Sequence, residues 1–232
     1  MTWLADLTWP EAGERAAAAM LAVPVASTEQ HGPHLPLSTD TDLAVALCAR
    51  LAAAAPPAGL DVIVAPPLAY GSSGEHQDFA GTLSIGQEAL ELVLVELVRS
   101  ATRTFRRILL VSTHGGNAAP VRGAERRLRD ESRDVLAWMP RWRGDAHAGR
   151  TETSLQLALA SERVRLDRAR PGDTRPIAEI LPLLQSSSVR AVSPSGVLGD
   201  PAGASAAEGV ALLDQLLAHL LATVTAWRAP AS

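Results

Sequence analysis

Short apolar runs alternate with longer segments of helical periodicity along this chain of 232 residues. Four runs have the length of buried strands, and they occupy residues 21–26, 60–65, 108–112 and 135–139. Helical periodicity marks residues 10–19, 41–55, 86–104, the stretch after Asn117, 151–161 and 206–227. Residues 177–209 are rich in Ser, Gly and Pro, and we assign no element there before the final helix. The alternation predicts an α/β fold whose mostly parallel sheet carries helices on both faces, in one domain over residues 1–232.

Polar residues gather in the loops that follow the predicted strands. Five of the six histidines lie in or beside these loops, namely His31, His34, His76, His114 and His147. Because the carboxyl ends of parallel strands meet at one edge of a sheet, and ligands bind there, we expect a functional site at this edge.

The loop after the first strand carries the densest group of candidate ligands. Within residues 27–40 it presents Glu29, His31 and Asp40, and a glycine and two prolines between them prevent regular structure. Such oxygen and nitrogen ligands suit Zn, Mn or Fe(II). Asp40 precedes a predicted helix, so it could instead be an N-cap, and Asp42 is its rival for either role. The loop predicts a metal site.

The loop after the third strand carries His114 in the sequence Thr-His-Gly-Gly-Asn. Its two glycines allow the backbone to pass close to a bound ion or substrate, and Asn117 can cap the helix that follows. A phosphate-binding loop is the competing interpretation. However, this sequence lacks both the lysine of a P-loop and the three-glycine spacing of dinucleotide sites. His114 is therefore a candidate ligand.

His147 and Glu152 stand on either side of a glycine that leads into a predicted helix. Glu152 could merely complement the helix dipole, and His147 could be an ordinary surface residue. Loops crowded with Gly, His and acidic residues are disproportionately functional, so we favour a chemical role for both.

Candidate substrate contacts lie in two other loops. The glycine-rich loop after the second strand contains Tyr70, Glu75 and His76, which could orient a substrate or tie the loop to the body of the protein. Trp138 and Trp142 flank the loop that leads to the predicted site. Core packing is the default role of both tryptophans, and Trp142 is the candidate for substrate contact.

Composition excludes several classes of function. Hydrophobic residues make up 47% of the chain and charged residues 20%, as in globular enzymes, and the net charge of −4 with scattered arginines does not indicate nucleic-acid binding. The N-terminal residues lack the pattern of a signal peptide, and no apolar run reaches the roughly 20 residues of a membrane span. A single cysteine, Cys48, falls inside a predicted helix and suits a core position. We expect a cytoplasmic enzyme that binds neither nucleic acid nor membrane.

Four motifs together resemble the creatininase family of metal-dependent amidohydrolases. In chain order they are STEQHGPHLPL followed by TD, GEHQDFAGT, HGGN and HAGRTETS. The resemblance extends from about residue 21 to residue 227, and the stretches APPLAYGSSGEHQDFAGTLSIG and AVSPSGVLGDPAGASAAEG are similar to a branch of peptidases that trim a modified precursor peptide. It implies a three-layer α/β/α fold and two divalent metal ions per chain, Fe(II), Zn or Mn. It also implies a homo-oligomer, a hexamer or an octamer.

The resemblance also implies roles for individual residues. Glu29 and His114 would hold one metal ion and His31 the other, with Asp40 bridging them. Creatininase itself has a metal-binding glutamate where this chain has Gly116, a glycine that is shared with the family's deformylases and peptidases. Glu152 or water would then complete the second site.

The implied reaction is cleavage of the C-terminal Val-Tyr portion from the modified precursor peptide. A water between the metal ions would attack the amide, His147 would protonate the departing amine, and Glu152 would assist the proton transfer or bind metal. Alternatives are deformylation of a formamidopyrimidine nucleotide, hydrolysis of creatinine, and a binding module without turnover.

Overall fold

A parallel five-stranded sheet forms the centre of the protein. The computed structural model describes residues 1–141 and 144–228, and its sheet has the order β1-β3-β2-β4-β5. The strands are Thr2–Trp3 (β1), Met20–Val25 (β2), Val62–Val64 (β3), Arg107–Ser112 (β4) and Asp134–Trp138 (β5). The four predicted strands are confirmed. The edge strand β1 was not predicted, because two residues are too few to form a periodic pattern.

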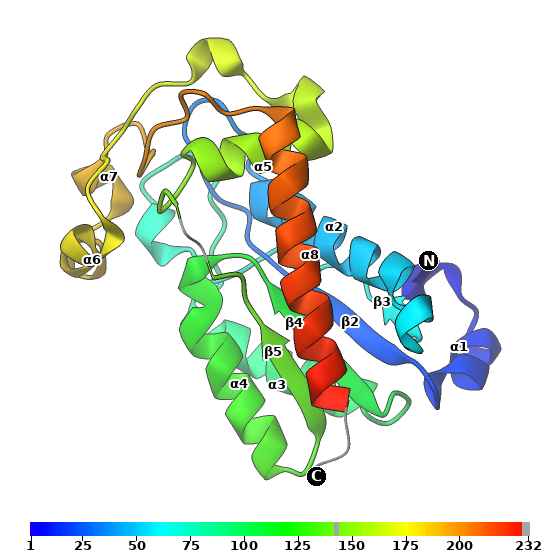
Figure 1. Cartoon of the computed structure of the whole chain (residues 1–232). Coiled ribbons are helices and arrows are strands. Elements are labelled where there is room, and N and C mark those ends of the chain that lie inside the picture. The colour runs from blue at the N-terminus through cyan, green and yellow to red at the C-terminus, as the bar shows by residue number, and fades with distance from the viewer. Residues whose placement is uncertain (142–143, 229–232) are drawn as a thin grey trace.

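Helices cover both faces of the sheet (Figure 1). One layer contains α2 (Thr39–Ala54), α5 (Arg150–Ala160) and α8 (Ala206–Arg228), and the other contains α3 (Gln87–Ala101) and α4 (Ala118–Asp130). The N-terminal helix is α1 (Trp9–Ala16). Two helices, α6 (Ile177–Ser186) and α7 (Val189–Val192), lie in the segment to which the sequence assigned no element. The result is the expected three-layer α/β/α arrangement.

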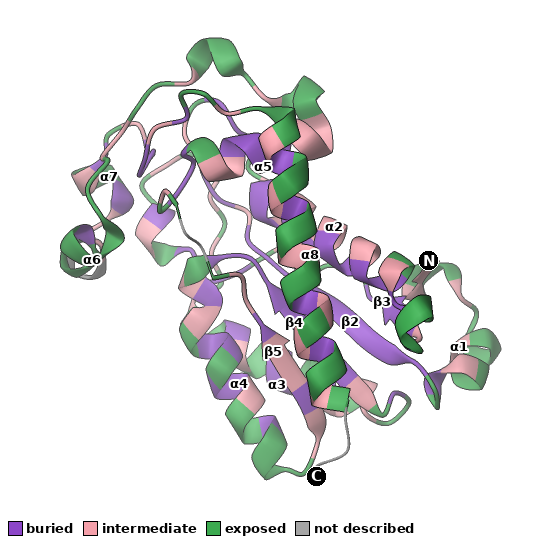
Figure 2. Ribbon diagram, viewed as in Figure 1, coloured by how far each residue is buried: buried purple, intermediate pink, exposed green. Residues whose placement is uncertain are grey.

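The central strands β2 and β4 are mostly apolar because both of their faces are buried (Figure 2). Successive side chains of a strand point to opposite faces, so β2 sends Leu21 and Val23 into the core beneath α3 and α4. Its alternate residues, Met20 and Ala22, enter the core beneath α2 and α8. Cys48 is fully buried in this second core, as the sequence predicts.

Helix α8 is long and apolar enough to cross a membrane by length and composition alone. In the fold it packs along α2 and α5, and it contributes Leu213, Leu220 and Val224 to the core beside the sheet. Its buried apolar residues therefore help to form the helical layer that α8 shares with α2 and α5.

The strand order places a topological switch point between β2 and β4. The chain runs from β2 to β3 on one side, and then crosses to β4 and β5 on the other. Strands β2 and β4 pair in register from Met20 with Arg107 to Val25 with Ser112, so both end at the same level. The crevice outside such a switch point is where ligands bind in open α/β sheets.

Candidate metal centre

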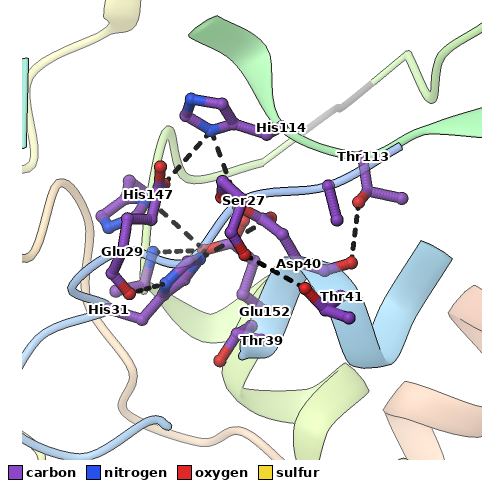
Figure 3. A network of polar contacts seen from close by, with 12 residues as sticks. Ser27, Glu29, His31, Thr39, Asp40, Thr41, Thr113, His114, His147 and Glu152 are labelled. Carbon is purple, nitrogen blue, oxygen red and sulfur yellow. Dashed lines mark hydrogen bonds and ion pairs between the residues drawn. The ribbon is translucent and has the colours of Figure 1, made fainter. Parts of the chain in front are cut away.

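Acidic and imidazole side chains from four segments converge outside this switch point (Figure 3). Glu29 and His31 come from the loop after β2, and Asp40 from the first turn of α2. His114 follows β4, His147 lies in the loop before α5, and Glu152 lies in the first turn of that helix. The predicted site residues that the sequence scattered over more than a hundred positions are thus brought together.

Glu29 lies at the centre of the group. Its side chain is 0% exposed, and neither carboxylate oxygen has a hydrogen-bond partner in the described part of the chain. Its Oε1 is 3.1 Å from His114 Nδ1, 3.5 Å from His76 Nε2 and 3.9 Å from His147 Nδ1. Burial alone would raise the pKa of Glu29, but the neighbouring imidazoles outweigh it and lower the pKa well below the ordinary value. A buried, unpartnered carboxylate of this kind requires a positive charge beside it.

Asp40 spans the two halves of the group. Its Oδ1 is 3.7 Å from His31 Nε2 and its Oδ2 is 3.5 Å from His114 Nδ1, while the Ser27 hydroxyl donates to Oδ2. The N-cap of α2 is Ser38, which leaves the Asp40 side chain free to face the site. Asp42, its rival in sequence, instead accepts hydrogen bonds from Arg163 and Gln156. Asp40 therefore faces both His31 and His114, one with each carboxylate oxygen.

Backbone carbonyls fix the orientation of His31 and His114. His114 Nε2 lies 2.9 Å from the Ser72 carbonyl oxygen, and His31 Nδ1 lies 3.2 Å from that of Glu29. Each ring donates a proton there, and its other nitrogen faces the carboxylates, where it could bind a cation after losing its own proton. This backing is typical of metal-binding histidines. His31 Nε2 is buried and has no hydrogen-bond partner among the residues described.

The charges of the two rings lead to the same conclusion. Although burial opposes it, Asp40 raises the pKa of His31 to about 10 and Glu29 raises that of His114 to about 10. Without a cation, the carboxylates thus hold protons on the rings. The unpartnered Glu29 oxygens and His31 nitrogen fit divalent cations that would replace those protons.

His147 and Glu152 face each other across the entrance to α5. Glu152 Oε2 accepts the N–H of Ala148 at 2.5 Å and lies 3.9 Å from both His31 Nε2 and His147 Nδ1. Burial raises the pKa of Glu152 to about 7. Burial and the neighbouring His31 and His76 rings lower the pKa of His147 well below its ordinary value. His147 is therefore neutral near pH 7, whereas Glu152 holds a proton for part of the time.

A cavity of about 980 Å³ opens over the group. Glu75 and His76, two of the predicted substrate contacts, line it. Tyr70 is 49% exposed and is not among the described lining residues. Trp142 lies outside the part of the chain that the structure describes. Trp138 is buried and donates its indole N–H to His219 Nδ1 at 3.0 Å, so it packs in the core.

The sequence analysis missed two supporting residues. Gln30 contacts both His76 and His147, and its position between two candidate ligands was the only signal of a role. Asn117 occupies the predicted N-cap position of α4, but its side chain makes no capping hydrogen bond. Instead, its amide oxygen accepts the N–H of Ser72 and its amide nitrogen donates to the Ala26 carbonyl oxygen. Asn117 therefore ties the loop after β3 to the end of β2.

Comparison with known proteins agrees with this geometry. A family model described as "Creatininase: Creatinine amidohydrolase" matches residues 5–224. The mycofactocin precursor peptide peptidase of Mycobacterium ulcerans (strain Agy99) is 45% identical over 95% of this chain and 86% of its own length. The creatinine amidohydrolase of Pseudomonas putida is 30% identical over 91% of this chain and 92% of its own length. A solved structure described as "Creatininase Mn" superposes with a TM-score of 0.82 at 27% identity and covers 99% of both chains.

The sequence match and the superposition both extend over nearly the whole chain, including every segment that contributes to the centre. With its parallel sheet, three layers and carboxylate–histidine group at the switch point, the chain belongs to the creatininase family of amidohydrolases.

Proposed function

We propose that this protein is a metal-dependent peptidase that cleaves the C-terminal, modified Val-Tyr portion from the mycofactocin precursor peptide. The observation that carries the hydrolase assignment is the fully buried Glu29 carboxylate, which faces three imidazoles and has no hydrogen-bond partner among the described residues. The peptide substrate is supported by relatives named for this reaction, which are 45% and 47% identical.

The donor set supports two divalent cations per chain, with Fe(II), Zn and Mn all compatible. Glu29 and His114 would hold one cation, His31 would hold the other, and Asp40 would bridge them. When bound, the cations would lower the pKa of a water molecule to about 7 and polarise the scissile carbonyl. The buried surroundings keep bulk water away and strengthen these charge interactions.

Departure of the amine requires a proton, and we assign its transfer to Glu152. The carboxyl lines the cavity, and its pKa of about 7 allows it to accept a proton from the attacking water and donate it to the leaving nitrogen. His147 suits this role less well than the sequence suggested, because its Nε2 faces the Gln30 carbonyl oxygen at 2.8 Å and its pKa is low.

The cavity supports a peptide end as the substrate. Its volume of about 980 Å³ is at the upper end of the range of small-molecule sites. α6, α7 and the segment that follows them supply the apolar part of the cavity wall, which includes Leu181, Leu184, Val189 and Leu198. Such a wall suits valine and tyrosine side chains.

The test is mass spectrometry of a reaction between metal-loaded protein and the modified precursor peptide. We expect release of the Val-Tyr-derived fragment. Asp40→Asn should abolish both metal binding and cleavage. Asp42→Asn, two residues further along α2 and outside the site, is the matched control and should retain both. Cleavage by the Asp40 variant at the rate of the Asp42 variant would overturn the metal mechanism. Turnover of creatinine but not the peptide would overturn the substrate assignment.

We also propose a cytoplasmic homo-oligomer, a hexamer or an octamer. Exposed apolar residues on α3, Leu92, Val93 and Leu97, support self-association, because such a patch on a protein surface commonly marks an interface. Light scattering coupled to gel filtration measures the assembly size directly.

A further inference from the structure

Two further histidines point into the centre beside the ligands assigned above. His147 Nδ1 lies 3.9 Å from Glu29 Oε1, and His76 Nε2 lies 3.5 Å from the same oxygen. By distance alone either ring could bind a cation. Their contacts with Gln30 give the two rings different roles.

The backbone fixes the orientation of the Gln30 amide. Its Oε1 accepts the N–H of Gly32 at 2.8 Å, and its Nε2 donates to the Gly196 carbonyl oxygen at 3.1 Å. Turning the amide over would set oxygen against oxygen at Gly196 and N–H against N–H at Gly32. Gly196 has a φ of 81°, and a β-carbon there would lie closer than 3.0 Å to the Gln30 amide. The close approach of this glycine thus holds the amide in one orientation.

The fixed amide determines the tautomer of His76. Gln30 Nε2 lies 2.8 Å from His76 Nδ1, so that ring nitrogen must accept the hydrogen bond. The proton of the neutral ring then resides on Nε2, the nitrogen that faces the site. A protonated nitrogen has no lone pair for a metal ion and can only donate. The nearest carboxylate oxygen to it is Glu29 Oε1.

The opposite holds for His147. Its Nε2 lies 2.8 Å from the main-chain carbonyl oxygen of Gln30 and 3.1 Å from Gln30 Nε2. The two protons of that amide are directed at the Gly196 carbonyl oxygen and at His76 Nδ1, which leaves none for His147. His147 Nε2 must therefore carry its own proton in order to face the carbonyl oxygen. Nδ1 therefore presents its lone pair to the centre, 3.9 Å from Glu152 Oε2. The ring also lies close to His31, with 4.3 Å between ring centroids.

We propose that His147 binds the second cation through Nδ1, and that His76 binds none and instead directs its Nε2 proton toward Glu29 Oε1, 3.5 Å away, where its charge distribution helps to position the carboxylate. His31 offers a ligand atom within 4.8 Å of one on His147, and its Nε2 lies 3.7 Å from Asp40 Oδ1. His31, Asp40 and His147 would then supply three protein ligands and leave one position open, as in catalytic zinc sites. Glu152 remains beside the open position for proton transfer. The inference rests on the proposed function only in that the centre holds divalent cations.

The first test is titration calorimetry with Zn²⁺ on chelator-treated protein. Wild type should bind about two ions per chain. His147→Ala should bind about one, and His76→Ala should still bind about two, with first-site affinity lowered roughly 10- to 100-fold, the usual effect of losing a group that supports a ligand. Two ions in His147→Ala, or one in His76→Ala, would overturn this inference and leave the metal enzyme intact. No tight site in wild type would instead overturn the proposed function.

The second test does not require either histidine to be replaced. In metal-free protein with ¹⁵N-labelled histidine, nitrogen chemical shifts should place the proton of both rings on Nε2. Gln30→Met removes the amide but keeps the main-chain carbonyl. It should therefore disturb the tautomer of His76 and leave that of His147 unchanged. A proton on His147 Nδ1 in wild type, or a His76 tautomer unchanged in the variant, would contradict the assignment.

Discussion

Gly115 and Gly116 offer a direct test of how tightly the loop after β4 is packed. A β-carbon added at Gly116 would lie closer than 3.0 Å to the Ser72 carbonyl oxygen, to His114 Nε2 and to Glu75 Oε1. A β-carbon added at Gly115 would have no heavy atom within 4 Å. Neither glycine has a positive φ, so the same change at adjacent positions differs only in its surroundings.

The two substitutions should change the stability of the fold in opposite directions. Gly116→Ala forces a methyl group against backbone, and overpacking of this kind costs roughly 1–3 kcal/mol. Gly115→Ala should stabilise the fold by roughly 0.4–1 kcal/mol, because it restricts the unfolded chain. A chain of this size loses roughly 2–4 °C of melting temperature per kcal/mol. The two variants should therefore differ by roughly 3–16 °C, with Gly116→Ala the less stable.

The Gly116 variant should also bind metal more weakly. The added methyl group pushes on the hydrogen bond between His114 Nε2 and the Ser72 carbonyl oxygen, which holds the His114 ring in position. Loss of such support typically lowers metal affinity roughly 10- to 100-fold. Thermal unfolding and Zn²⁺ titration of both variants check these expectations. Equal melting temperatures and equal affinities would refute the packing argument. For the same reason, we expect that Gly116→Glu alone does not produce a creatinine hydrolase.

Three other predictions follow from the buried polar groups. Burial lowers the pKa of His34 to about 4. The unfolded chain therefore binds more protons between pH 6.5 and 4, so stability should fall as the pH falls through this window, by about 3 kcal/mol from this group. Urea unfolding of the metal-free proteins measures this, and the His34→Gln variant should lose about 3 kcal/mol less stability than wild type over the same pH range. Equal losses in wild type and variant would contradict the prediction. Removing the metal with a chelator should lower the melting temperature, because Zn²⁺ at 100 times its dissociation constant stabilises the fold by about 2.7 kcal/mol. An unchanged melting temperature would contradict binding of Zn²⁺ to the folded protein. Asn117→Ala should cost roughly 1–3 kcal/mol, since it leaves the buried Ser72 N–H and Ala26 carbonyl without their partner; urea unfolding measures this, and a cost near zero would contradict it.

Much of the fold and the position of the site could be predicted because both depend on local patterns. The apolar runs of β2 and β4 are long enough to identify, and the polar residues that follow them must emerge at the same edge of a parallel sheet. Helix α6 escaped prediction because Pro182 and exposed leucines interrupt its apolar periodicity. The choice between Asp40 and Asp42 also required the structure. Both lie in the first turn of α2, and only their neighbours across the fold distinguish them.

The roles of the histidines could not be predicted because they are set by groups distant in sequence. His31, His76, His114 and His147 all lie in loops after strands and look equivalent along the chain. Three of them face a main-chain carbonyl and so present a lone pair to the centre, whereas His76 faces an amide N–H and presents a proton. That amide is held by Gly196, which lies 166 residues from Gln30. It follows that a variant far in sequence from the proposed metal ligands, such as Gly196→Ala, can change which histidine is able to bind a cation without altering any of those ligands.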